Sequence, residues 1–172
     1  GGAAALAVAL STSVGEARAP QGGGPAVDFD KQVKPILAAS YADGTLERAN
    51  VAFDDLGHIG AVWVTIEDGS DPSLWARLFD KAAGGWKSPT KIDTSRTYLG
   101  VPQILFLPDG GVRAFWIEVE SDVPSVYVSE YAAEKWGGGQ VFGGRGFKDA
   151  NPTAFSFEAD KGGRVTVAYE TK

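Results

Sequence analysis

Three aromatic residues recur at a fixed interval along this chain, and they constrain its fold more than any other feature. Trp63, Trp116 and Tyr169 follow one another at intervals of 53 residues. They stand in the similar stretches AVWVTIE (61–67), VRAFWIEVE (112–120) and RVTVAYE (164–170). Self-similarity at a period near 50 residues is typical of a supersecondary unit that is repeated along the chain. We therefore expect several copies of one unit.

Each repeat has the pattern of β-strands joined by tight turns. The first strand of the unit reads NVAFDD (50–55), PQILFL (102–107) or TAFSFE (153–158), and a glycine-bearing turn follows it. The third strand reads SLWARLF (73–79) or SVYVSEY (125–131), and a fourth strand opens at Trp86 or Trp136. Alternation with β-branched and aromatic residues predicts strands, and Asp-Gly or Gly-Gly predicts hairpin turns. The sequence therefore predicts an all-β protein.

The length of the period suggests the architecture. Roughly 50 residues is the length of one four-stranded antiparallel blade of a β-propeller. We divide the chain into a signal-peptide-like segment, a linker whose ILAASY (36–41) resembles a degenerate outer strand, two blades, and the first half of a further blade. The boundaries are 1–19, 20–46, 47–96, 97–147 and 148–172. This is a partial propeller of about 2.5–3 blades, and a ring needs at least ~4. We expect the rest of the polypeptide or homo-oligomerisation to supply the other blades.

The layout resembles secreted bacterial β-propeller repeat proteins. Their blades read as a strand, a D-x-x-G turn, AVW, ARxFD, and then GW before a proline-containing outer strand. The matching residues are Asp54 to Gly57, AVW (61–63), ARLFD (76–80) and GGWKSP (84–89). The resemblance implies an extracellular propeller with an architecture like that of sialidases and lectins. The sialidase Asp-box does not transfer, because it lies between strands three and four whereas Asp109-Gly110 lies between strands one and two.

Composition excludes several classes of function. The formal net charge is −6 and the basic residues are scattered, which argues against a nucleic-acid partner. There is no cysteine and His58 is the only histidine, so thiolate zinc sites and multi-histidine metal sites are excluded. We expect no cofactor and no metal.

The N-terminal residues have the pattern of an export signal. AAALAVAL (3–10) is a short apolar run, and Ala17-Arg18-Ala19 fits the small-x-small pattern of signal-peptidase sites. The run is too short to span a bilayer, which takes about 20 apolar residues. We expect a secreted or periplasmic protein with no membrane span.

The candidate binding residues lie in loops that a propeller gathers on one face. They repeat in kind from one blade to the next, and they comprise Asp71, Arg96, Tyr98, Asp122, Arg145 and Phe147. A sugar ring stacks on an aromatic side chain, while arginine and carboxylate groups hydrogen-bond to its hydroxyls. The sequence thus predicts a lectin-like module that binds a glycan or an extracellular protein. The alternative is a purely structural role, in which these arginines and aromatics only pack between neighbouring blades.

Two other functions stay open. Glu118, Glu120 and Asp122 alternate along a strand end, which is compatible with the paired carboxylates of a propeller glycoside hydrolase. No nucleophile and base pair is visible, so we assign no catalytic residue and place a binding module ahead of an enzyme. A purely structural repeat domain is the third possibility.

Overall fold

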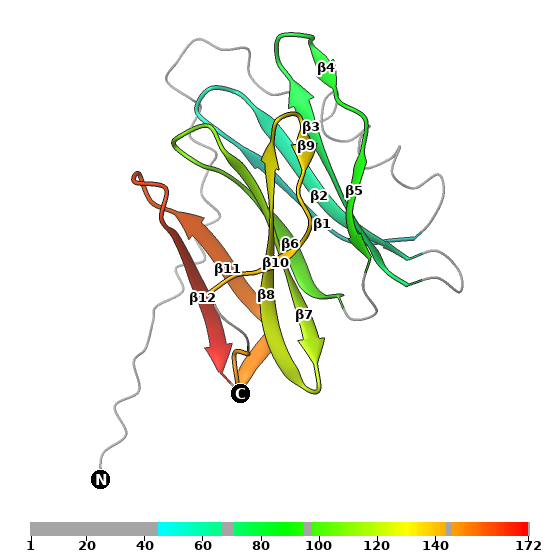
Figure 1. Cartoon of the computed structure of the whole chain (residues 1–172), viewed down its shortest axis with the longest axis vertical. Coiled ribbons are helices and arrows are strands. Elements are labelled where there is room, and N and C mark those ends of the chain that lie inside the picture. Colours follow the sequence, from blue (N-terminus) through cyan, green and yellow to red (C-terminus); the bar gives the residue numbers. More distant parts are fainter. Residues whose placement is uncertain (1–44, 67–70, 95–97, 144–145, 172) are drawn as a thin grey trace, which may run out of the picture.

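The computed structural model describes residues 45–66, 71–94, 98–143 and 146–171 (Figure 1), and for residues 45–47 and 98–101 it describes the backbone alone. Every regular element in these ranges is a β-strand, and every strand pairing is antiparallel. This confirms the predicted all-β antiparallel fold. The signal-peptide-like segment 1–19 and the strand expected at 36–41 lie outside the described residues.

The first sheet contains the first repeat. Its strands are β1 (Thr45–Phe53), β2 (Ile59–Ile66), β3 (Ser73–Asp80), β4 (Gly85–Trp86) and β5 (Thr90–Thr94). β2 lies between β1 and β3, and both β4 and β5 pair with β3. The sequence predicts a single fourth strand, whereas the chain forms two short ones. Pro89 stands between them and has no backbone N–H to donate to the ladder.

The second sheet repeats this arrangement. Its strands are β6 (Tyr98–Phe106), β7 (Val112–Glu120), β8 (Val123–Ala132), β9 (Lys135–Trp136) and β10 (Gln140–Val141). Three glycines, 137–139, separate β9 from β10, and both of these strands pair with β8. Trp116 pairs with Tyr127 across β7 and β8, as Trp63 pairs with Trp75 across β2 and β3. The repeat in the sequence is therefore also a repeat in strand register.

The third sheet has two strands in the described part of the chain. These are β11 (Ala150–Ala159) and β12 (Val165–Thr171), and Phe155 pairs with Tyr169. None of the three described sheets closes on itself.

The same turn joins the first two strands of every sheet. Gly57, Gly110 and Gly163 have φ of 80°, 84° and 79°, and they are spaced by 53 residues. In each turn the glycine N–H donates to the backbone carbonyl three residues earlier. A residue with a Cβ is strained at such φ values, so glycine at the fourth position of each turn explains why the hairpins form where the sequence predicts them.

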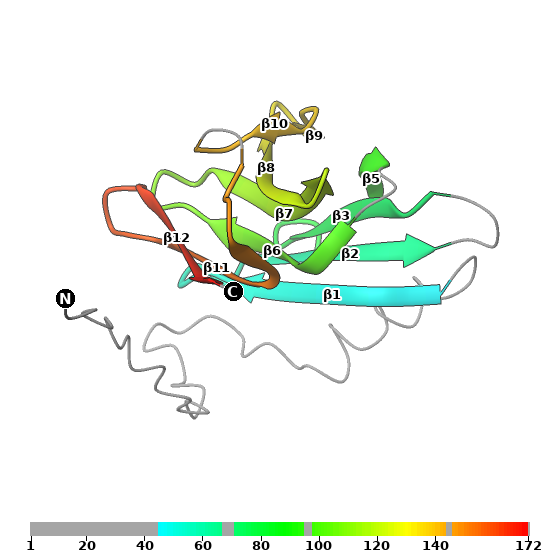
Figure 2. The ribbon, with the colours of Figure 1, turned by 90° about the horizontal axis from the view of Figure 1, so that it is seen from below.

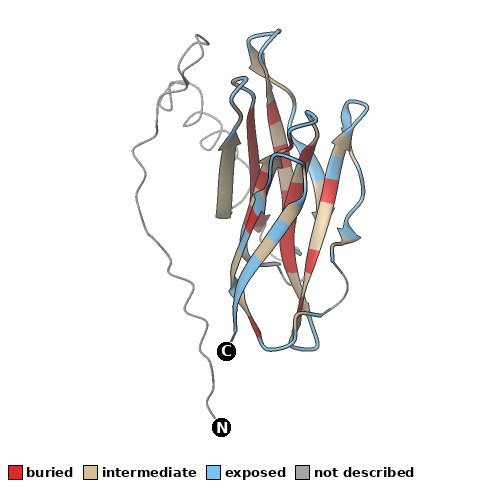
Figure 3. Cartoon of the chain, turned by 90° about the vertical axis from the view of Figure 1, so that its left-hand side faces the viewer, coloured by how far each residue is buried: buried red, intermediate tan, exposed pale blue. Residues whose placement is uncertain are grey.

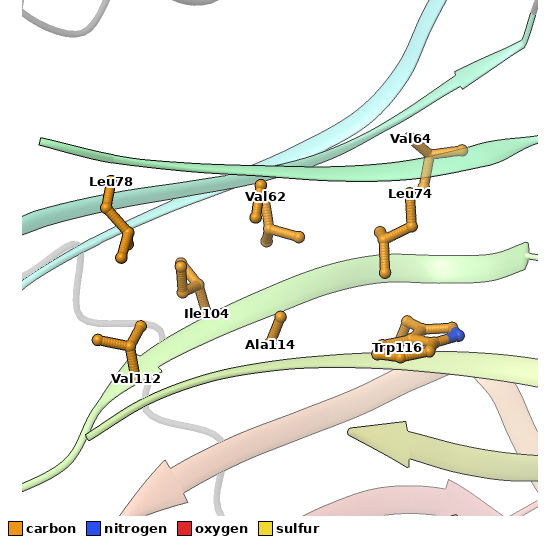
Figure 4. Close-up of a cluster of buried hydrophobic side chains, with 9 residues drawn as sticks. Val62, Val64, Leu74, Leu78, Ile104, Val112, Ala114 and Trp116 are labelled. Atoms are coloured by element: carbon orange, nitrogen blue, oxygen red, sulfur yellow. The ribbon is translucent and has the colours of Figure 1, made fainter. Parts of the chain in front are cut away.

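The sheets pack face to face around two apolar clusters. The first cluster joins Val62, Val64, Leu74, Ala76 and Leu78 of the first sheet to Ile104, Val112, Ala114 and Trp116 of the second (Figure 4). The second cluster joins Phe115, Ile117 and Val126 of the second sheet to Phe157 of the third. Because successive residues of a strand point to opposite faces, β7 contributes to both clusters. Figure 3 shows that burial is concentrated on the strands, with the turns exposed.

Side-chain amides connect the first strands of successive sheets. β1 contacts β6 and β6 contacts β11, so the first strands of successive sheets lie side by side (Figure 2). The Oδ1 atom of Asn50 accepts a hydrogen bond from the backbone N–H of Ile104 at 3.1 Å. Oε1 of Gln103 accepts from the N–H of Phe157 at 3.2 Å, and its Nε2 donates to the carbonyl of Phe155 at 3.1 Å. The same contact therefore recurs at both sheet interfaces.

Candidate functional site

The strand ends that flank the connections with the predicted binding residues are paired with one another in each sheet. Strand pairing brings Thr45 to Ile66, Leu99 to Ile117 and Ala150 to Thr171 at one end of the sheets. The β7–β8 turn and the end of β12 lie there, at the bottom of Figure 1. The gathering of the binding loops on one face stays a prediction, because parts of these loops lie outside the described residues.

The two predicted aspartates are exposed at this end but are not equivalent. Asp71 precedes β3, and Asp122 stands in the two-residue turn between β7 and β8 with a φ of 64°. Thr65 pairs with Ser73 and Glu118 pairs with Ser125, so β3 repeats as β8 after 52 residues. In that register Asp71 corresponds to Val123. The interval of 51 residues between the aspartates is therefore one residue shorter than the interval between the two strands.

The aromatic candidate Phe147 contacts other rings. Its ring lies 5.6 Å from that of Phe155 and 5.3 Å from that of Tyr169, edge to face in both cases. It also packs against the second core cluster. These ring contacts are the ones expected if Phe147 packs between sheets and does not bind a ligand. Arg96, Arg145 and the side chain of Tyr98 lie outside the described residues, although the Tyr98 backbone opens β6.

The carboxylates considered for hydrolysis lie at the end of β7 and in the β7–β8 turn. Oε1 of Glu118 accepts a hydrogen bond from the indole N–H of Trp116 at 2.8 Å. Glu120 ends β7 and is exposed, and Asp122 lies in the turn beyond it. In the described part of the chain, no three His, Cys, Asp or Glu side chains gather in a way that could hold a metal ion.

A charged contact links the segment after β4 of the first sheet to the β8–β9 turn of the second. The Lys87 ammonium group donates to a carboxylate oxygen of Glu134 and, at 3.2 Å, to the hydroxyl of Tyr131. The hydrogen bond with Glu134, followed by that with Tyr131, raises the pKa of Lys87 above its ordinary value. The same bond with Lys87, followed by that with Tyr131, lowers the pKa of Glu134. Both groups are therefore held in their charged forms.

An open groove of about 520 Å³ lies on the outer part of the second sheet, and the sequence did not predict it. Arg113, Glu130, Lys135 and Gln140 supply its polar lining, and Val128 and Phe142 supply its apolar lining. The Nε and Nη2 atoms of Arg113 lie 2.9 and 2.8 Å from Oε1 of Glu130. Gly137, Gly138 and Gly143 also line the groove.

The register shows why this groove exists on the second sheet. Glu130 occupies the place of Leu78 in the first sheet, and Arg113 occupies the place of Gly60. Leu78 is buried under the second sheet, whereas the side chain of Glu130 is 54% exposed. The sequence carried one signal of this groove: Glu130 stands at the repeat position that Leu78 occupies in the first sheet.

No family model, no curated protein and no solved structure matches this chain. The fold and the candidate site define an all-β protein of repeated antiparallel sheets with an exposed loop end and an open groove. No helix in the described ranges is long and apolar enough to cross a membrane.

Proposed function

We propose that the three sheets are consecutive blades of an extracellular, secreted or periplasmic, β-propeller interaction module. The observation that carries this proposal is the repeated amide contact. Asn50 reaches the N–H of Ile104, and Gln103 reaches the N–H of Phe157, so both steps span 54 residues. Equal steps between inner strands are expected when blades rotate about a common axis. Further blades, in the same polypeptide or in other copies of the chain, complete the ring.

The proposed ligand is a glycan bound at the loop end. Asp71 and Asp122 expose carboxylates there, and carboxylates form strong hydrogen bonds with sugar hydroxyls. The sequence repeats the pattern of arginine, one intervening residue and an aromatic at Arg96 and Arg145, which lie outside the described residues. Phe147 contributes less to this surface because it packs against other rings. A surface built from several weak contacts suits a polymeric ligand.

A glycan array followed by titration calorimetry on the whole chain tests this function. The variant Asp122→Gly removes a carboxylate at a position whose φ of 64° suits glycine. We expect about tenfold weaker binding of the polysaccharide that the array identifies, because a charge-assisted hydrogen bond is lost.

The matched control is Ala133→Gly, which makes the same backbone change at a φ of 48° in the β8–β9 turn, at the opposite end of the sheet. It should bind the polysaccharide as the parent does. An array without any bound glycan, or equal losses for the two variants, contradicts carbohydrate binding at the loop end.

A further inference from the structure

We propose that residues 26–41, which precede β1, pack as the outer strands of a further sheet on the first sheet. They cover the side of β2 that faces away from the second sheet, and this side is called the outer face below. Residues 26–41 lie outside the described part of the chain, which begins with β1 at Thr45. The inference rests on the proposed function in one respect, namely that successive sheets of this chain pack as blades.

The burial of β2 is the first observation. Its first seven residues, 59–65, are all buried, so both faces of this strand are covered. β7, which packs against the first and the third sheet, is likewise buried on both faces over 114–117. A strand with one face in solvent instead alternates in its burial, as β12 does over 165–168. β2 therefore has the burial pattern of a strand between two sheets.

The described sheets cover only one of these two faces. Val62 and Val64 point into the apolar cluster between the first and second sheets. Because alternate residues of a strand point to opposite sides, Ile59, Ala61 and Trp63 form the outer face. These three residues are 1%, 1% and 4% exposed, yet neither apolar cluster of the described residues includes them. Another segment is therefore needed to cover the outer face.

The interface between the first and second sheets shows what kind of segment fits the outer face. Ala61 and Trp63 have Ala114 and Trp116 as their counterparts in the second sheet, 53 residues later. The side chains of the first sheet that pack against this counterpart face include those of β3 and β5, namely Leu74, Ala76, Leu78 and Ile92. The outer face should therefore accept a segment of the β3 and β5 type.

The residues before β1 repeat the sequence of β3 and of the stretch that follows it. AVDFDK (26–31) stands 50 residues before ARLFDK (76–81), and four of the six residues are identical. VKP (33–35) then resembles WKSP (86–89), which begins within β4. The order of β3 and β4 is thus present in these residues.

The distance to β1 agrees with the position of β5. LAASY (37–41) stands 53 residues before β5, and three residues separate it from β1 at Thr45. Three residues, 95–97, likewise separate β5 from β6 at Tyr98. The connection from an outer strand to the first strand of the next sheet therefore has the same length at both places. Residues 26–41 satisfy both the pattern and the connection that the outer face requires.

The alignment assigns two neighbouring side chains to opposite sides of the segment. Ala26 takes the place of Ala76, which is 0% exposed in the cluster between the first two sheets. Val27 takes the place of Arg77, which is half-buried and points to the other side of β3. A charge introduced at position 26 should therefore enter the apolar interface with the outer face, whereas a charge at position 27 should not.

The test uses the full chain with a single introduced thiol. The chain has no cysteine, so Ala61→Cys carries the only thiol, and its rate of labelling by iodoacetamide reports access to the outer face. Ala26→Asp should raise this rate more than about tenfold, because a carboxylate is not tolerated in an apolar interface and releases the segment. Val27→Asp adds the same charge one residue later and should alter the rate less than about twofold. Equal rates for the two variants overturn the proposal.

A second thiol position separates local release of the segment from general unfolding. Ala114→Cys places the only thiol at the counterpart position of β7, which the first sheet covers. Its labelling rate should stay within about twofold in both segment variants, because the first and second sheets remain packed. A rate that rises equally at the two thiol positions overturns the proposal.

Protein concentration distinguishes the segment from a second copy of the chain. The labelling rate of Ala61→Cys should not depend on concentration, because the segment belongs to the same polypeptide. A rate that falls as the concentration rises assigns the outer face to a second copy and overturns the proposal. Asn50→Leu tests the packing of the described sheets without residues 26–41, and the glycan array is independent of both. Failure of this inference and failure of the proposed function are therefore distinguished.

Discussion

The side chain of Gln103 holds the second and third sheets together through both of its amide atoms. Its oxygen accepts from the N–H of Phe157 at 3.2 Å, and its nitrogen donates to the carbonyl of Phe155 at 3.1 Å. Phe157 is 5% exposed, so water is a poor substitute for this partner. The contact is therefore expected to stabilise the packing of the third sheet on the second.

Replacing this amide tests the contact directly. Gln103→Leu should lower the free energy of unfolding by about 1–3 kcal/mol, because a part-buried backbone N–H loses its acceptor. Asn50→Leu should have a similar effect through the N–H of Ile104. Denaturant titrations measure both. Gln140→Leu, at an exposed position, should change stability by no more than about 0.5 kcal/mol. If all three variants lost the same free energy of unfolding, the inter-sheet hydrogen bonds would contribute no more than an exposed side chain.

The three repeated aromatics should differ in their contribution to stability. Trp63→Ala and Trp116→Ala remove rings that are 4% and 2% exposed, and each should cost ~3–5 kcal/mol. Tyr169→Ala removes a ring that is 44% exposed, and it should cost about 1 kcal/mol. Thermal or chemical unfolding of the three variants checks this order. A loss below ~1 kcal/mol for Trp63→Ala would mean that the repeat position is not a core position.

The repeated turn glycines should be sensitive to any side chain. Gly110→Ala places a Cβ at a φ of 84° and should cost about 1–2 kcal/mol, although no atom lies within 4 Å of that Cβ. The control is Gly85→Ala, which is equally open and has no positive φ, and its expected cost is at most about 0.5 kcal/mol. Chemical unfolding separates the two effects, since equal costs would exclude backbone conformation as the cause.

The Lys87–Glu134 contact should make stability depend on pH at the acid end. The pKa of Glu134 is lowered in the folded protein, so its contribution is present above the unfolded-state value of about 4.3 and is lost as the pH falls through the folded value. The pKa of Lys87 is raised, so its contribution is lost only in strongly basic solution. Glu134→Gln should therefore be less stable than the parent near pH 7, and this difference should shrink as the pH falls through the lowered pKa of Glu134.

The matched background for that comparison is Lys87→Gln. In this background the further change Glu134→Gln should cost less near neutral pH, because the main partner of the carboxylate is already absent. Unfolding curves across the pH range measure both pairs. A difference between the parent and Glu134→Gln that stays constant from neutral to acid pH contradicts the assignment.

The loops and the groove show the limit of reading the sequence alone. The interval of 51 residues between Asp71 and Asp122 suggests equivalent positions in the two repeats. The strand register shows instead that Asp71 corresponds to Val123, one residue beyond Asp122. The sequence left Phe147 open as a ligand contact or as a packed ring. The structure packs its ring against Phe155 and Tyr169, which the sequence does not place beside it. Whether such a side chain packs or faces a ligand depends on neighbours that are distant in the sequence, and a sequence pattern does not identify those neighbours.

The sequence by itself determined the first three strands of each repeat, the hairpin turns and their repetition, but not the division of the fourth strand into two. These follow from local rules: alternation assigns each residue to one of two faces, and glycine at positive φ positions each turn. Only the tertiary structure decided which faces are covered. Leu78 and Glu130 occupy the same repeat position, yet one is buried beneath the next sheet and the other borders an open groove. Alternation specifies the direction of a side chain, whereas burial depends on whether another sheet lies opposite it.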